Sequence, residues 1–136
     1  MINAGYSGTP LIKKLGIRPE MKVLLVRAPD NYNDLLGSDI SGQHSLKTDT
    51  PDFVHLFAIN KKIFESEMKK LRKFYKKNPR LVIWVSWYKK SSAIPTDITE
   101  DTIRNYALKN GLVDIKVCAV SEIWSGLKLV VPISKR

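Results

Sequence analysis

The residues most suited to binding a charged ligand follow the ends of three apolar runs. They are Arg27 and Asp30 after the run 23–26, Asn60 after the run 53–59, and Lys89, Lys90 and Ser91 after the run 81–87. Ammonium and guanidinium groups bind carboxylates and phosphates, and indole rings at Trp87 or Trp124 would add a stacking surface. This set predicts a site for an anionic small molecule or a protein partner. The simpler alternative is that the lysines are solvated and both tryptophans pack in the core.

The sequence offers no clear set of residues for catalysis or metal binding. Neither Ser86 nor Ser125 lies in the glycine-flanked elbow that exposes a serine nucleophile. His55 falls inside an apolar run, and no His, Cys or acidic cluster has metal-ligand spacing. Cys118 lies in an apolar run with no activating cation beside it, which predicts a buried, unreactive thiol. We therefore expect no catalytic residue, no metal and no bound cofactor, and the sequence leaves open whether the protein is an enzyme.

The candidate binding residues require a parallel sheet to bring them together. The nearly continuous apolar runs 53–59 and 81–87 are typical of strands covered on both faces. Residues 61–77 between them have apolar side chains at Phe64, Met68, Leu71 and Tyr75, the spacing of a helix that buries one stripe. A helix between two strands is the crossover that parallel pairing needs. Because parallel strands end at one edge, the residues that follow them should converge there.

The rest of the chain fits the same α/β plan. A first strand is expected over 21–26, and short helices over 9–16, with Thr9 as N-cap, and 30–37. A helix begins after Thr99 and runs to residue 110, followed by a strand over 113–120. Ser125 and Gly126 are expected to turn the chain into a last, antiparallel strand over 127–131. The polar segment 38–50 holds at most a short strand near an edge.

The charge of the chain is concentrated in one segment. The 136 residues carry 23 Lys and Arg against 13 Asp and Glu, a net charge of +10. Nine of the basic residues and only two acidic ones lie within 61–80. A basic helix of this kind can bind nucleic acid, but a solvated face is the more ordinary interpretation, and nucleic acid is the less favoured partner. The length suits a single domain spanning 1–136.

The location of the protein is predicted from its composition. No apolar stretch approaches the length of a membrane span, and residues 1–8 do not read as a signal peptide. A single cysteine allows no internal disulfide. We expect a cytoplasmic protein with no membrane partner.

Several segments resemble a family of short bacterial proteins grouped as a domain of unknown function. They are Tyr6–Leu11 with Lys13–Gly16, Pro95–Asp97 with Thr99–Asp101, Asp114–Val120 and Trp124–Val130. The resemblance covers essentially the whole chain and implies no particular activity. The segment 6–9 also precedes a helix, where it would either bind an anion or act only as a cap.

The expected architecture is also similar to the later half of class I methyltransferases. The prediction is a Rossmann-like, three-layer α/β sandwich with a mainly parallel sheet and a terminal antiparallel strand pair. The resemblance implies S-adenosylmethionine as an alternative ligand, but the loop after the first strand reads Arg27-Ala28-Pro29-Asp30 instead of the glycine-rich turn that such enzymes use. A non-catalytic binding protein is the expected function, with a small methyltransferase and a nucleic-acid-binding protein as alternatives.

Overall fold

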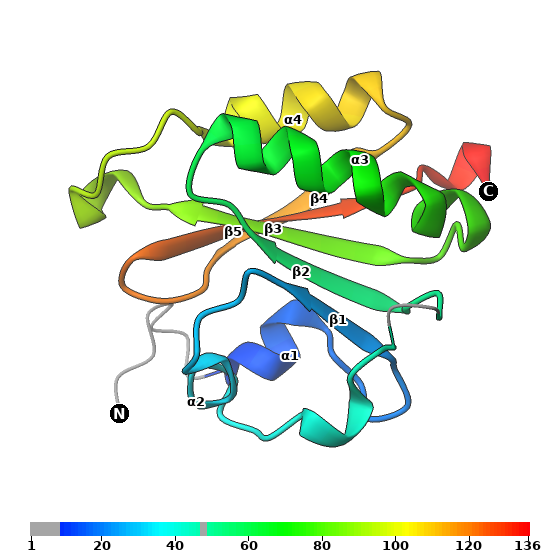
Figure 1. Cartoon of the computed structure of the whole chain (residues 1–136), viewed down its shortest axis with the longest axis horizontal. Coiled ribbons are helices and arrows are strands. Elements are labelled where there is room, and N and C mark those ends of the chain that lie inside the picture. The colour runs from blue at the N-terminus through cyan, green and yellow to red at the C-terminus, as the bar shows by residue number, and fades with distance from the viewer. Residues whose placement is uncertain (1–8, 47–48) are drawn as a thin grey trace.

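The computed structural model describes residues 9–46 and 49–136 and has three layers (Figure 1). A five-stranded sheet lies between α3 and α4 on one face and α1 and α2 on the other. The strands are β1 Val23–Val26, β2 Phe53–Phe57, β3 Val82–Tyr88, β4 Val113–Ala119 and β5 Trp124–Val130. The helices are α1 Leu11–Leu15, α2 Tyr32–Leu36, α3 Lys61–Lys77 and α4 Glu100–Lys109, with short 3-10 helices η1 Ser41–Gln43, η2 Lys90–Ser92 and η3 Ile133–Lys135.

The sheet confirms the predicted fold class. Its order is β1-β2-β3-β5-β4, in which β1, β2 and β3 are parallel while β5 runs antiparallel to both neighbours. Every residue of β2 is buried, because helices cover both of its faces. The chain reverses at residues 121–123 before β5, so Ser125 and Gly126, expected to form the turn, lie inside the strand. The antiparallel pairing itself was predicted correctly.

Helix α3 is the crossover between β2 and β3, with the bounds that the sequence predicts. Phe64, Met68, Leu71 and Tyr75 are its buried residues, and they pack onto the sheet with side chains of α4. Asn60 is the N-cap, and its side chain accepts a hydrogen bond from the Ile63 N–H at 2.8 Å. The amphipathic stripe therefore positions α3 and leaves its lysines facing outward.

On the opposite face, a buried tryptophan holds α1 against the sheet. The indole Nε1 of Trp84 donates a hydrogen bond to the Leu15 carbonyl at 2.9 Å. Gly126, on the adjacent strand, lies beneath this ring: a Cβ there would be 3.1 Å from Cε3 of Trp84 and 3.0 Å from Cγ2 of Val120. The absence of a side chain at residue 126 allows the indole to approach β5 closely.

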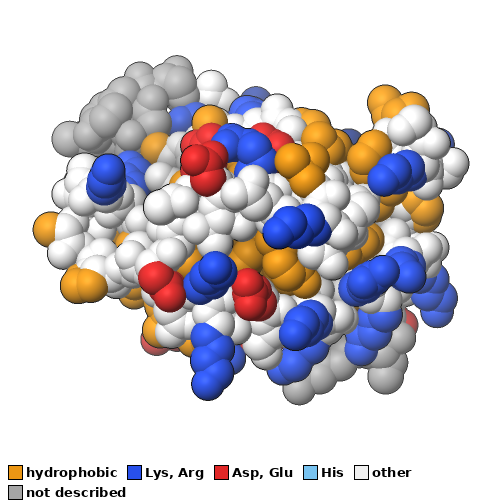
Figure 2. Space-filling view, turned by 90° about the horizontal axis from the view of Figure 1, so that it is seen from above, with side chains coloured by type: hydrophobic (Ala, Val, Ile, Leu, Met, Phe, Trp, Pro, Cys, Tyr) orange, Lys and Arg blue, Asp and Glu red, His pale blue; other side chains and the backbone are white. Residues whose placement is uncertain are grey.

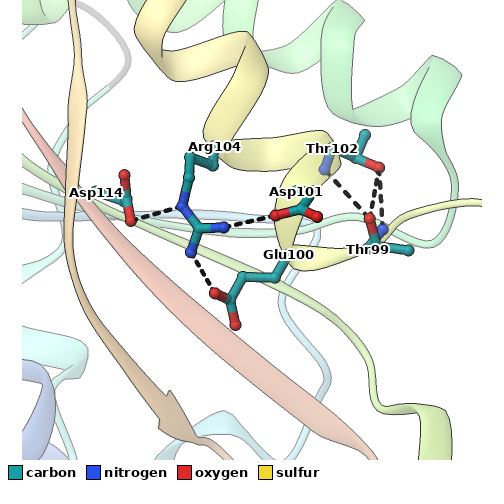
Figure 3. A network of polar contacts seen from close by, with 6 residues as sticks. All are labelled: Thr99, Glu100, Asp101, Thr102, Arg104 and Asp114. Carbon is teal, nitrogen blue, oxygen red and sulfur yellow. Dashed lines mark hydrogen bonds and ion pairs between the residues drawn. The ribbon is translucent and has the colours of Figure 1, made fainter.

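One arginine ties α4 to the edge strand β4 (Figure 3). Arg104 donates from Nε to Asp114 at 3.0 Å and from Nη1 to Asp101 at 2.6 Å, and it also bonds Glu100. The hydrogen bonds to Glu100 and Asp114 raise the pKa of the guanidinium. Thr99 caps the helix through a capping box with Thr102, as the sequence predicts for the start of α4. This network holds α4 against the edge strand β4.

Three local expectations need correction. Helix α1 begins at Leu11 and its N-cap is Pro10. The predicted cap, Thr9, lies one residue before the observed one. Described residues of 38–50 form no strand, only η1 and a single parallel bridge from His44 to Val23. Cys118 is partly exposed instead of buried, because β4 is an edge strand with no neighbour on its outer side. Burial still raises the pKa of its thiol.

Residues 1–8 and 47–48 lie outside the described residues, and so does most of the segment 6–9 considered as an anion site. Within the described part of the chain, no helix combines the length and apolar character needed to cross a membrane.

Candidate ligand-binding edge of the sheet

The carboxyl ends of β1, β2 and β3 open onto one edge of the sheet, at the left of Figure 1. The loops at this edge are 27–31, 58–60 and 89–99, and η2 extends from it beyond the strands. In open α/β sheets this is the edge at which ligands bind. All the residues predicted as a site follow strands ending here except Trp87, within β3, and Trp124, which begins the antiparallel strand β5.

Arg27 has a left-handed backbone conformation, with φ of 58°. This is the conformation in which glycine is favoured, so the chain makes a tight turn after β1 without the glycine. Nε of Arg27 donates to Oε2 of Glu67 on α3 at 2.7 Å, and the Glu67 side chain is only 13% exposed. The guanidinium predicted to meet a ligand is thus engaged by the protein's own carboxylate.

The N-terminus of α3 is occupied in the same way. Asn60, a predicted ligand-binding residue, uses its side chain as the cap of the helix. Asp97 reaches in from the loop after η2, and its Oδ1 accepts a hydrogen bond from the Lys61 N–H at 2.7 Å. Thr96 joins the same two loops by donating to the Ile59 carbonyl at 3.0 Å. An internal carboxylate therefore lies where the positive end of a helix would otherwise attract an anion.

The lysines after β3 remain available. Lys89 is held through its backbone, which donates to the Ile123 carbonyl at 2.9 Å, and Ser92 closes η2 by donating to the Lys89 carbonyl. Lys90 and Ser91 are exposed. Among the described residues, no carboxylate forms an ion pair with Lys89 or Lys90. Asp30 is exposed and forms no ion pair within that same set.

The two predicted stacking rings lie on opposite faces of the sheet. Trp87 packs in the core under α3 and α4, Trp124 packs in the core on the α1 side, and each is only 7% exposed. Tyr88 instead stacks on Trp124, with ring centroids 4.4 Å apart, and is partly exposed. Strand alternation gives the reason, since Tyr88 points to the face opposite Trp87. Tyr88 is thus a partly exposed ring at this edge, whereas the sequence analysis assigned the stacking role to Trp87 or Trp124.

A buried network of three polar side chains joins α2, β2 and β3. Tyr32 Oη lies 2.7 Å from Nδ1 of His55, and Nε2 of His55 lies 2.7 Å from Oγ of Ser86. Burial lowers the pKa of His55 to about 3 and raises that of Tyr32, so both are neutral at pH 7. The contact of serine with histidine resembles a nucleophile and its base. However, His55 and Ser86 have no exposed surface and Tyr32 only 3%, so no substrate reaches them.

These buried hydrogen bonds were not predicted, because the sequence places His55 and Ser86 in separate apolar runs. Only the pairing of β2 with β3 brings these two residues together. Predicting their contact from the sequence would have required knowing the register of the two strands. Residues 9–46 and 49–136 contain no group of three or more His, Cys, Asp or Glu placed to hold a metal ion.

Solved structures share the fold at low sequence identity. A protein of the NADB-Rossmann superfamily from Streptococcus agalactiae has a TM-score of 0.56 and 8% identity, over 90% of this chain and 68% of that one. TnmH has a TM-score of 0.52 and 18% identity, over 96% of this chain and 48% of that one. The B. subtilis tRNA methyltransferase TrmK has a TM-score of 0.46 and 8% identity, over 81% and 49%. The chain thus spans about half the length of the latter two.

No protein-family model and no curated protein matches the chain. The comparisons therefore show the fold, a Rossmann-like α/β sandwich, and not the activity.

Proposed function

We propose that the protein is a non-catalytic binding protein that takes an anionic ligand, or an acidic segment of a protein partner, at the carboxyl-end edge of its sheet. One observation carries the proposal: the buried and capping carboxylates at this edge are used internally, while its lysines are not. Glu67 is held by Arg27, and Asp97 by the N–H of Lys61. Beside the exposed carboxylate of Asp30, the edge is left with four ammonium groups, those of Lys61, Lys62, Lys89 and Lys90.

The cations belong to two segments whose backbone is held by hydrogen bonds, the start of α3 and the loop after β3. Lys61 and Lys62 begin α3, whose start is capped by Asn60 and Asp97. Lys89 is anchored to Ile123, and the following turn is closed by Ser92. Because the backbone of both segments is already rigid, less entropy is lost on binding. A phosphate or carboxylate group that contacts both segments orders only the lysine side chains.

The methyltransferase alternative is not favoured by the residues present. In the class I fold, cofactor binding uses close backbone approach after the first strand and an acidic residue after the second. Here the loop after β1 carries Arg27, whose side chain is paired with Glu67, followed by Pro29. On the outer side of β1 there is only a single bridge to His44, so no further strand among the described residues could end in such an acidic residue. The site does not fit S-adenosylmethionine. We expect no saturable heat in a calorimetric titration, and saturation in the micromolar range would restore the enzyme hypothesis.

The binding proposal is tested with pyrophosphate and citrate as probes. In amide NMR spectra, we expect shifts confined to the loops 27–31, 58–62 and 88–93. The double variant Lys89→Ala/Lys90→Ala should weaken binding by about tenfold, because an ion-paired hydrogen bond contributes roughly 1.5–3 kcal/mol in favourable cases. Lys13→Ala/Lys14→Ala removes the same charge from α1 and is the matched control. Shifts spread over the whole surface, or equal weakening in both double variants, would contradict the proposal.

A further inference from the structure

The outward face of α3 carries a row of lysines, of which only the first, Lys62, also belongs to the carboxyl-end edge. The buried residues of the helix occupy one stripe. Lys62, Lys69, Lys73 and Lys76 follow one another at intervals of seven, four and three residues, which places them on a single line along the opposite side. Lys77 and Arg80 continue the cationic surface past the end of this line. We call these six residues the basic stripe.

The basic stripe is not neutralised by the protein. All six residues are exposed, and none forms an ion pair with a carboxylate in the described part of the chain. Of the two acidic residues on α3, Glu67 is held by Arg27 and lies near Lys70. Only Glu65 is left, and it is partly buried on the flank nearest Tyr106. Figure 2 looks onto the face formed by α3 and α4 and shows more Lys and Arg side chains than acidic ones along it.

We infer that the basic stripe is a docking surface for the phosphate backbone of a nucleic-acid duplex, bound without regard to sequence. From Lys62 to Lys76 the stripe is about 21 Å long, at 1.5 Å per residue. A DNA duplex carries one phosphate charge per about 1.7 Å of its axis, so a duplex lying along α3 places phosphates within reach of every lysine in the line. Lysines on flexible stems suit this contact, since they act as point charges.

The rings on α3 are buried or partly buried, which favours a duplex over a single strand. Single strands bind by stacking their bases on aromatic side chains. Phe64 and Tyr75 are buried in the core, and Phe74 is partly buried with the ammonium of Lys73 5.1 Å from its ring centroid. A paired duplex requires no such stacking surface, because it presents only its backbone to the helix.

The same burial argues against a membrane as the partner. Helices that lie in a bilayer surface insert an apolar face. The apolar stripe of α3 is already packed against the sheet, with Phe64 and Met68 fully buried. The helix can therefore offer a membrane only its charge, whereas for a duplex the charge is the main source of affinity.

The test measures binding of a labelled 20-base-pair DNA duplex of mixed sequence by fluorescence anisotropy across a salt series. We expect the logarithm of affinity to fall linearly with the logarithm of salt, with a slope of about −4 to −5 for five or so neutralised phosphates. The triple variant Lys69→Ala/Lys73→Ala/Lys76→Ala should lower that slope by about 2.7 in magnitude, at about 0.9 for each phosphate that is no longer neutralised. Its far-UV circular dichroism and thermal midpoint should match the wild type.

The control variant is Lys13→Ala/Lys14→Ala/Lys116→Ala, which removes the same charge from the α1 side, where Nζ of Lys116 donates to the Lys14 carbonyl. It should bind the duplex with the wild-type slope. Equal weakening in the two triple variants would show an effect of net charge alone and overturn the inference. So would tighter binding to a single strand of equal length, or binding to phosphatidylserine vesicles but not to the duplex. Lys89→Ala/Lys90→Ala should leave duplex binding unchanged, which separates this surface from the carboxyl-end edge.

Discussion

Asp97 caps helix α3 from a loop 36 residues further along the chain: its Oδ1 accepts a hydrogen bond from the backbone N–H of Lys61 at 2.7 Å. The contact places a negative charge at the positive end of the helix, an arrangement that stabilises both. It also joins the loop after η2 to the start of the crossover helix. Two of the loops at the carboxyl-end edge are thereby held at a fixed separation, with lysines on each.

Replacing Asp97 by Asn should strengthen anion binding while weakening the fold slightly. The amide oxygen can still accept from Lys61, so only the charge is removed, at a cost of about 0.3–1 kcal/mol in unfolding free energy. Removing a carboxylate from the edge makes its field more positive, and pyrophosphate should bind more tightly than to the wild type. Urea denaturation and NMR titration measure the two effects. Weaker pyrophosphate binding in this variant would argue against a site at this edge.

The strain at Arg27 can be separated from its ion pair by comparing two variants. Arg27→Ala and Arg27→Gly both remove the ion pair with Glu67, but only glycine adopts the positive φ without strain. We expect the glycine variant to be more stable than the alanine variant by about 1 kcal/mol, the usual cost of a left-handed residue with a side chain. Chemical denaturation of the pair is sufficient. Equal stabilities would mean that the loop relaxes to another conformation when the arginine is replaced.

Gly126→Ala should destabilise the protein by about 1–3 kcal/mol, the range found for overpacking in a well-packed core. The added methyl group would press on Trp84 at 3.1 Å and on Val120 at 3.0 Å. Displacement of the indole would also stretch its hydrogen bond to Leu15 and loosen α1. We expect a lower denaturation midpoint and a change in tryptophan fluorescence. Gly42→Ala is a suitable control, because a Cβ there meets nothing within 4 Å. A wild-type midpoint for Gly126→Ala would show that Trp84 has room to move.

His55 should make the stability depend on pH below neutrality. Its pKa is about 3 in the folded protein and near 6.5 when unfolded, so between these values the unfolded chain binds a proton that the folded protein does not. The contribution of His55 is complete above about pH 6.5 and declines by up to about 1.4 kcal/mol per pH unit as the pH falls toward 3. Unfolding at several pH values from 7 to 4.5 measures the slope. The variant His55→Gln should be less stable at pH 7 but show a shallower slope, and an unchanged slope would assign the effect to the carboxylates.

The sheet and its helices could be predicted because their signals are local. The helix over 61–77 has the predicted bounds, and its four buried residues are the ones at helical spacing, since periodicity within one element is independent of the rest of the fold. The parallel pairing of β1, β2 and β3 follows from the crossover connection and was predicted for the same reason. Cys118 was misjudged because an apolar run does not say whether its strand is central or at an edge.

The residue sequence by itself determined the layers, the amphipathic helix and the edge at which polar residues gather. The tertiary structure alone decided which of those residues are available. Arg27 is bound by Glu67, 40 residues away, and His55 lies between Tyr32 and Ser86, 23 and 31 residues away. Such contacts depend on how the β2–α3–β3 crossover packs. A charge or a hydroxyl has no fixed partner in the sequence, and its chemistry is decided only when folding brings a second polar group within hydrogen-bond distance.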